Sequence, residues 1–207
     1  MGTHPDYRGG LFMEKNEFIS KQALRSRYLG CRNSLSASER KEKSAAIWEL
    51  LKKEAVFQKA QIVLVYMDYR SEVMTTALVE EILAAGQKRV FAPKVEGMDI
   101  QFYEVESMED FTDGYQGIRE PLQAQEKLFT QKMSKEADCL ILVPGAVFDR
   151  ERGRMGYGKG FYDRYLSAFP DLTSVSPAFA CQIARKVPVE EHDKRPDMII
   201  TETEVFR

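Results

Sequence analysis

The sequence predicts an α/β protein, a single domain with a three-layer α/β/α architecture built on a mostly parallel, mixed central sheet. Two observations lead to this fold class. Short apolar runs of the kind that form buried strands alternate along the chain with segments of helical periodicity, an order typical of sheets covered by helices. The chain has 207 residues without a repeat or a linker-like segment, and a chain of this length buries about 70% of its unfolded surface as one domain.

Two helices are predicted before the first strand. Apolar residues among many charges indicate an amphipathic helix over 14–31, which sets Lys21 and Arg25 four residues apart on one face. From their spacing alone these cations are most simply a solvated basic face, and the alternative is that an anion lies between them. Ser36-x-x-Glu39 is a capping-box pattern, which opens a second helix extending to about Lys53.

Three strands and a further helix follow. The apolar run 61–66 is predicted to be the first strand, and a loop leads from it to a helix over 75–85 that Gly86 closes. Residues 88–93 and 100–105 are predicted as two more strands. The second alternates between apolar and polar residues as an edge strand does, so mixed pairing is expected there.

The last third of the chain holds the most informative segment. Residues 138–143 form an apolar run typical of a buried strand, and the glycine-rich segment 152–164 follows it. That order places the segment at the carboxyl edge of the sheet, where open α/β sheets bind ligands. A helix is predicted from Phe161 to about Ala168, and late strands over 174–180 and 197–201.

The glycine-rich segment predicts a phosphate site. Its four glycines let backbone N–H groups approach an anion that a Cβ would block, and Arg154 and Lys159 supply positive charge. It is not a standard Walker A loop, because Gly160 stands where that loop needs Ser or Thr, and it lacks the dinucleotide spacing G-x-G-x-x-G. Asp163 is the nearest acid for a metal. The alternative interpretation is a solvated turn.

The order of residues around this segment is specific. Val143-Pro144-Gly145-x-x-Phe148-Asp149 is followed by the run RMGYGKGFYDR from Arg154 to Arg164, and three further pieces precede them: Lys21-x-x-Leu24-Arg25, Tyr66 with Glu72-Val73-x-Thr75, and Gly117-Ile118-x-Glu120-Pro121. The combination closely resembles the 5-formyltetrahydrofolate cyclo-ligases, also called 5,10-methenyltetrahydrofolate synthetases. The resemblance extends from Lys21 to Ile200 and implies a sugar-phosphate isomerase/CoA-transferase-like form of the α/β fold.

The resemblance implies a ring closure that depends on ATP and Mg²⁺. In this reaction the formyl oxygen on N5 of 5-formyltetrahydrofolate is phosphorylated, N10 attacks the activated carbon, and phosphate leaves. The products are 5,10-methenyltetrahydrofolate, ADP and phosphate. The inventory of cations and acids suits phosphoryl transfer, which needs positioning and charge neutralisation more than a covalent nucleophile.

The resemblance also assigns residues to this reaction. The nucleotide would be bound by Lys21, Arg25, Arg154, Met155, Gly156, Tyr157, Gly158, Lys159, Gly160, Phe161 and Tyr162, of which Arg154, Lys159 and Tyr162 are expected to act in catalysis. The folate would be bound by Met67, Glu72, Tyr115, Tyr157 and Phe161. Asp163 and Asp193 would hold the magnesium ion. The sequence departs from the family pattern at Phe161, where many relatives have tyrosine, and at Tyr115, which takes the place of an aromatic residue that is often tryptophan.

Several of these residues have a plainer interpretation when taken alone. Glu72 is most simply a charge at a helix start, where it complements the helix dipole. Asp193 lies in the charged segment 189–195, which is typical of a solvated turn. Cys139 lies inside an apolar strand and is expected to be a small core residue and not a nucleophile.

Composition limits the remaining classes of protein to which the chain could belong. The formal net charge of −2 argues against a general nucleic-acid binder. The three cysteines are widely spaced without C-x-x-C, which favours reduced thiols and a cytoplasmic protein. No stretch approaches the length of a membrane span. Residues 1–12 are interpreted as an expression leader that precedes a single domain over 13–207, expected to be a monomer acting on 5-formyltetrahydrofolate in its free or polyglutamylated form.

Two other functions stay open at this stage. A small-molecule kinase would use the same phosphates and cations but release a stable phosphorylated product. An anion-sensing α/β domain would bind without turnover.

Overall fold

The computed structural model describes residues 20–122 and 125–207, without the side chains of Tyr115 and Gln125. The predicted leader 1–12 and the predicted start of the first helix at residue 14 lie outside the described residues, as does the Tyr115 side chain.

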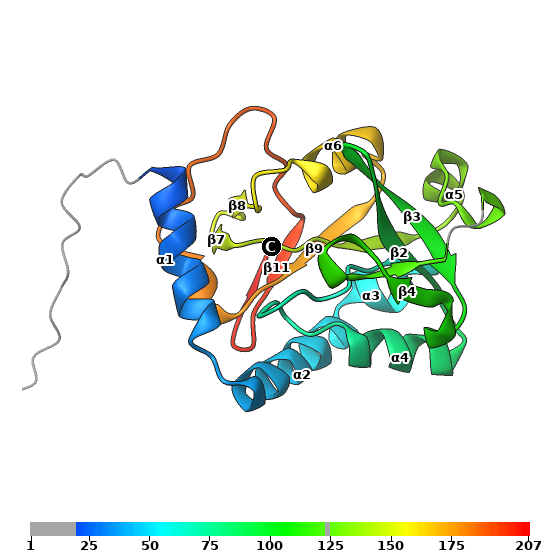
Figure 1. Cartoon of the computed structure of the whole chain (residues 1–207), viewed down its shortest axis with the longest axis horizontal. Helices are drawn as coiled ribbons and strands as arrows, with labels where there is room; N and C mark the ends of the chain where they lie inside the picture. The colour runs from blue at the N-terminus through cyan, green and yellow to red at the C-terminus, as the bar shows by residue number, and fades with distance from the viewer. Residues whose placement is uncertain (1–19, 123–124) are drawn as a thin grey trace, which may run out of the picture.

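A seven-stranded mixed sheet forms the centre of the fold (Figure 1), in the order β12-β11-β9-β6-β1-β2-β3. The strands β11, β9, β6, β1 and β2 run parallel to their neighbours, while β3 and β12 pair antiparallel at the two edges. The predicted mostly parallel, mixed sheet is therefore confirmed. The seven strands are β1 (Ile62–Leu64), β2 (Arg89–Glu96), β3 (Asp99–Val105), β6 (Cys139–Leu142), β9 (Thr173–Pro177), β11 (Met198–Ile200) and β12 (Val205–Phe206).

Helices cover both faces of this sheet. The α-helices are α1 (Lys21–Asn33), α2 (Ala37–Lys53), α3 (Ala55–Lys59), α4 (Thr76–Ala85), α5 (Gln131–Glu136) and α6 (Phe161–Ala168). Short 3₁₀ turns are η1 (Met108–Asp110), η2 (Tyr115–Gly117), η3 (Gln125–Lys127) and η4 (Ala180–Gln182). None of the helices in the described part of the chain is long and apolar enough to cross a bilayer.

The helix ends form where the sequence predicts them. The Ser36 hydroxyl accepts a hydrogen bond from the Glu39 N–H at 3.2 Å, and the Glu39 carboxylate accepts one from the Ser36 N–H at 2.8 Å, so the capping box is present. Helix α4 ends at Gly86, whose φ of 62° is the left-handed conformation that glycine adopts without strain. The predicted signature helix has the same bounds as α6.

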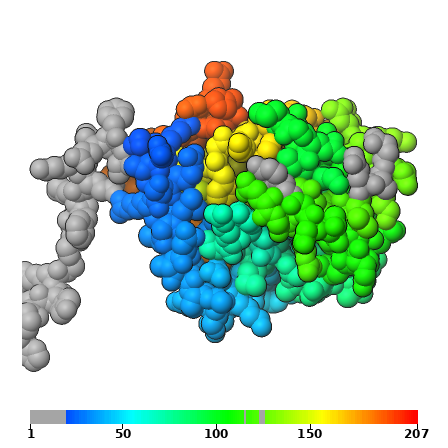
Figure 2. All heavy atoms as spheres, viewed as in Figure 1, coloured from blue at the N-terminus to red at the C-terminus, as the bar shows by residue number. Residues whose placement is uncertain are grey.

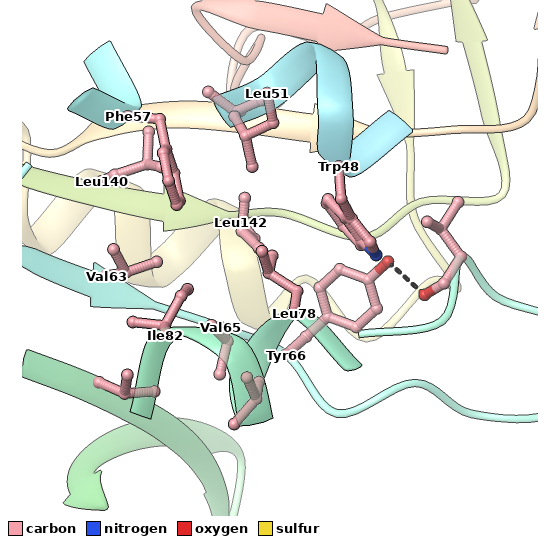
Figure 3. Packing of buried hydrophobic residues seen from close by; sticks show 14 of the residues in the cluster. Trp48, Leu51, Phe57, Val63, Val65, Tyr66, Leu78, Ile82, Leu140 and Leu142 are labelled. Carbon is pink, nitrogen blue, oxygen red and sulfur yellow. Dashed lines mark hydrogen bonds between the residues drawn. The ribbon is translucent and has the colours of Figure 1, made fainter. Parts of the chain in front are cut away.

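The core follows from the two-residue period of the strands. Val63 faces the layer formed by α2, α3 and α4, and it packs with Leu51, Phe57 and Ile82 (Figure 3). Its neighbours Ile62 and Leu64 face the opposite layer, which contains Tyr165 and Leu166 of α6. Each fully buried aliphatic side chain stabilises the fold by about 1.5–3 kcal/mol.

Two polar groups at the rim of the first layer are satisfied by the loop that follows β1. The Tyr66 hydroxyl donates to the Val73 carbonyl at 2.9 Å (Figure 3). The Trp48 indole N–H donates to the Met74 carbonyl at 2.7 Å. Buried aromatic residues with a polar group usually find a partner in this way. The loop 66–75 is thereby fixed against the core, which matters because it carries Glu72.

Two small sheets were not expected from the sequence. Strands β7 (Val147–Asp149), β8 (Arg154–Met155) and β10 (Ile183–Ala184) form one of them, and β4 (Phe111–Asp113) pairs with β5 (Arg119–Pro121) in the other. Arg154 and Met155, within the glycine-rich segment, therefore form a strand, which was not predicted from the sequence. Helix α1 packs through Leu24 on the sheet formed by β7, β8 and β10, outside the two helical layers.

Candidate active site

A cavity of about 450 Å³ opens at the carboxyl ends of β1, β2 and β6. Its walls come from α1, from the loop 66–72, from the β2–β3 hairpin, from the turn before β5 and from the glycine-rich segment. Figure 2 shows these parts meeting on one face, with α1 in blue and the glycine-rich segment in yellow. The lining residues include Leu29, Arg32, Tyr66, Met67, Glu72, Val95, Ile100, Ile118, Glu120, Pro144, Arg154, Gly156, Tyr157, Lys159, Gly160, Phe161, Tyr162 and Asp163.

The glycine-rich segment lies against the cavity in a conformation that needs its glycines. Gly158 and Gly160 have φ values of 93° and 67°, in the left-handed region. Gly160 caps the N-terminus of α6, so the loop ends where unpaired N–H groups favour an anion. Arg25 of α1 donates from Nε to the Gly156 carbonyl at 2.9 Å, so the predicted cation does lie at the loop.

Arg154 is buried in the cavity wall, with 2% of its side chain exposed. Its Nη2 pairs with the Asp163 carboxylate at 2.5 Å, and its Nη1 donates to the Pro144 carbonyl at 3.3 Å. Its Nε is buried and finds no hydrogen-bond partner in the described part of the chain. A buried N–H of a charged group left without a partner is costly, so the described residues do not fully satisfy this guanidinium.

The two predicted metal ligands lie on neighbouring segments, and each is paired with a cation. Asp163 Oδ1 accepts from Arg154 and, at 3.0 Å, from the backbone N–H of Lys194, the residue after Asp193. Asp193 Oδ2 accepts from the Lys21 ammonium at 3.3 Å. Among residues 20–122 and 125–207, no group of three or more His, Cys, Asp or Glu side chains is close enough to hold a metal.

Glu72 is the most buried carboxylate in the wall of the cavity, with 7% of the residue exposed. The Tyr157 hydroxyl donates to its Oε1, and the Tyr69 N–H donates to its Oε2 at 2.9 Å. Burial raises the pKa of Glu72 above its ordinary value, although the hydrogen bond from Tyr157 and the nearby Arg32 oppose that rise. Glu72, the residue predicted to bind the folate, is thus already held in place by Tyr157 of the glycine-rich segment.

Arg32 is a site residue that the sequence analysis missed. It is 5% exposed and donates to the Ser71 hydroxyl at 3.0 Å and to the Tyr157 hydroxyl at 2.5 Å. It therefore joins α1 to both the loop that carries Glu72 and the glycine-rich segment. The signal was present, because Arg32 lies eleven residues after Lys21 and seven after Arg25, spacings that put all three on one helix face.

The tyrosines of the segment stay protonated. The ring of Tyr157 is partly exposed, but its hydroxyl lies between Arg32 and Glu72. Burial of that hydroxyl raises the pKa of Tyr157, and Glu72 raises it further. Burial likewise raises the pKa of Tyr162, with Glu72 acting in the same direction and Arg154 against it. Both hydroxyl groups are therefore hydrogen-bond donors at neutral pH.

The other predicted site residues divide into two groups. Met67, Lys159 and Phe161 line the cavity. Met155 instead packs its side chain with Leu24 and other core residues under α1, so any ligand contact it makes is through its backbone. Cys139 is buried in β6, where burial raises its thiol pKa to about 11, as expected of a core cysteine.

Comparisons with known proteins agree on one family. The profile of the 5-formyltetrahydrofolate cyclo-ligase family matches residues 17–202. A probable 5-formyltetrahydrofolate cyclo-ligase from Schizosaccharomyces pombe is 32% identical over 73% of this chain and 79% of its own length, and the 5-formyltetrahydrofolate cyclo-ligase of Mus musculus is 27% identical over 88% and 94%. The solved structure of a 5,10-methenyltetrahydrofolate synthetase from Aquifex aeolicus superimposes with a TM-score of 0.78 at 34% identity, covering 90% of this chain and 92% of that one.

Proposed function

The chain belongs to the 5-formyltetrahydrofolate cyclo-ligase family, and we propose that it converts 5-formyltetrahydrofolate to 5,10-methenyltetrahydrofolate in the cavity described above, with ATP and Mg²⁺. The observation that carries the proposal is that one cavity is lined by both a glycine-rich cationic segment and a buried carboxylate, Glu72. The first suits a phosphate chain and the second a folate. Tyr157 joins them through its hydrogen bond to Glu72.

The residues present fit a nucleotide. Gly158 and Gly160 have the positive φ values of an anion-cradling loop, and Arg154 keeps a buried N–H without a partner in the described residues. Lys159 lines the cavity beside them. We assign ATP to this segment, with Arg25 supporting the loop and Lys21 at its margin.

The acids fit a magnesium ion bound together with phosphates. Mg²⁺ usually takes one or two carboxylates and completes its shell with phosphate oxygens and water, so a ready-made cluster is not required. Asp163 uses only Oδ1 in its hydrogen bonds to described residues, which leaves Oδ2 available. We assign Asp163 and Asp193 as the carboxylates that would hold it.

The chemistry divides between ligands and protein. ATP supplies the phosphoryl group that makes the formyl oxygen a leaving group, and Mg²⁺ neutralises charge on the phosphates. Arg154 and Lys159 stabilise the negative charge that develops during transfer, an effect typically worth about 10²–10³ in rate for each such donor. Tyr162, kept protonated by burial, donates to a substrate oxygen, and with Phe161 it limits access of water while N10 attacks the activated carbon.

The test is absorbance of the methenyl product in the near ultraviolet after mixing protein, 5-formyltetrahydrofolate, Mg²⁺ and ATP. We expect product only with ATP, and a rate lowered about 10²–10³-fold in Arg154→Ala. Arg185→Ala, which removes an exposed arginine, is the matched control and keeps the full rate. A folded wild-type protein that binds ATP but forms no product would refute the proposal, and a stable phosphorylated folate would identify a kinase instead.

A further inference from the structure

Glu120 is a second buried carboxylate in the cavity wall, and the functions assigned above do not use it. It lies in β5, is 8% exposed and lines the cavity. Its Oε1 accepts one hydrogen bond, from the Val95 N–H at 3.2 Å. Its Oε2 accepts none from residues 20–122 or 125–207.

The backbone around Glu120 holds its carboxyl group in one place. A Cβ added to Gly114 would collide with the Glu120 Cδ and Oε2, so the side chain lies directly on the Gly114 backbone. The Gly114 N–H donates to the Ile118 carbonyl at 2.9 Å, which closes the β4–β5 turn beneath it. Only glycine at 114 allows this approach, and the carboxylate is therefore pre-positioned.

The other buried carboxylates of the fold are better satisfied. Asp149 accepts three backbone N–H groups, from Glu151, Gly153 and Val187. Glu72 has a hydrogen bond on each of its oxygens. An ionised carboxylate offers about four acceptor positions, and a buried acceptor left unused costs stability. Glu120, which lines the cavity, therefore retains acceptor capacity.

We propose that Glu120 recognises the edge of the pterin ring that carries N3–H and the 2-amino group. These two donors lie side by side, and a carboxylate accepts such a parallel pair with both oxygens, the geometry that makes carboxylate recognition of a guanidinium specific. The inference rests on the proposed function, since it names the part of the folate that this wall binds. Glu120 is thus a specificity-determining residue for the pterin.

The experiment compares 5-formyltetrahydrofolate with its 2-desamino-2-methyl analogue, which lacks the donor amino group but keeps the reacting formyl and N10 atoms. For the wild type we expect kcat/KM for the analogue to be lower by about 10–100-fold, the usual loss for a hydrogen bond to a charged group. In Glu120→Ala the two substrates are expected to differ by less than about 3-fold, with KM for ATP unchanged. Glu126→Gln, at an exposed position, is the matched control and keeps the wild-type discrimination.

The outcomes separate this inference from the proposed function. If the wild-type protein cyclises neither compound, the proposed function itself is contradicted. Normal cyclisation with unchanged discrimination in folded Glu120→Ala overturns the role of Glu120 alone. If Glu120→Ala does not fold, Glu120→Gln decides, because it keeps the shape but replaces one acceptor by a donor, and discrimination equal to that of the wild type overturns the proposal.

Discussion

Replacing Arg32 by alanine tests whether α1 holds the two halves of the site together. The substitution removes the hydrogen bonds to Ser71 at 3.0 Å and to Tyr157 at 2.5 Å. It also removes the cation that opposes the rise in the pKa of Glu72. Breaking such a buried charged network costs about 3–5 kcal/mol.

The size of the effect on melting follows from the length of the chain. For proteins of 150–250 residues, 1 kcal/mol changes Tm by about 2–4 °C. A loss of about 3 kcal/mol, the lower end of that range, therefore lowers Tm by about 6–12 °C. Arg27→Ala removes the same charge from an exposed position of the same helix and is expected to change Tm little.

The pH dependence gives a sharper test. Burial raises the folded-state pKa of Glu72, so its contribution to stability is fully present below the unfolded pKa and is lost as pH rises through the folded value. Without Arg32 that folded pKa rises further. The Tm difference between wild type and Arg32→Ala is therefore expected to widen from pH 5 to pH 8, and to become independent of pH when Glu72→Gln is present in both proteins.

Differential scanning calorimetry at several pH values measures these differences. The same Tm difference at pH 5 and pH 8 in the Glu72-containing pair would refute the electrostatic argument. It would leave Arg32 as a packing residue only.

Three further predictions concern other parts of the structure. Gly158→Ala puts a Cβ on a residue with φ of 93°, which should destabilise the loop conformation by about 1–2 kcal/mol and raise KM for ATP. A KM for ATP equal to that of the wild type would contradict this effect on the loop. Asp149→Asn weakens a carboxylate that accepts three N–H groups at 2.7–2.9 Å and is expected to cost about 2–3 kcal/mol in urea unfolding, whereas Glu151→Gln at the exposed neighbour should not. ATP at 100 times its Kd should stabilise the protein by about 2.7 kcal/mol, and EDTA should abolish that gain if Mg²⁺ is needed; a gain that EDTA leaves unchanged would argue against the metal.

The sequence was sufficient for the parts of the fold governed by local rules. Ser36 and Glu39 cap α2, Gly86 ends α4, and the apolar run before the glycine-rich segment is the buried strand β6. These signals involve residues a few positions apart, so they depend little on contacts with distant parts of the chain. Strand β1 is shorter than the predicted run, because its regular pairing with β2 and β6 ends at Leu64, just before the chain reaches the cavity.

The long-range parts were not predictable in the same way. Strands β8 and β10 have two residues each, too few to show a period, and their pairing depends on β7 lying between them. The role of Arg32 depends on contacts 39 and 125 residues away. Spacing placed Arg32 on a helix face, but no local rule reveals that this face covers the cavity.

Some expectations stay predictions. These are the leader over 1–12, the single domain over 13–207, the monomeric state, the cytoplasmic location and the use of polyglutamylated folate. The role of Tyr115 beside the folate also stays a prediction, since its side chain lies outside the described residues.

The strand order has a consequence for how the protein is made. Strand β1 pairs with β6, in the register Ile62 with Cys139, and β6 pairs with β9, in the register Leu140 with Thr173. The middle of the sheet therefore joins segments that leave the ribosome far apart in time, and such non-local pairing folds slowly. A nascent chain released after α6 would contain the whole glycine-rich signature yet lack the strands that support it. We therefore expect the chain to bind its ligands only after its last strands have been synthesised and paired.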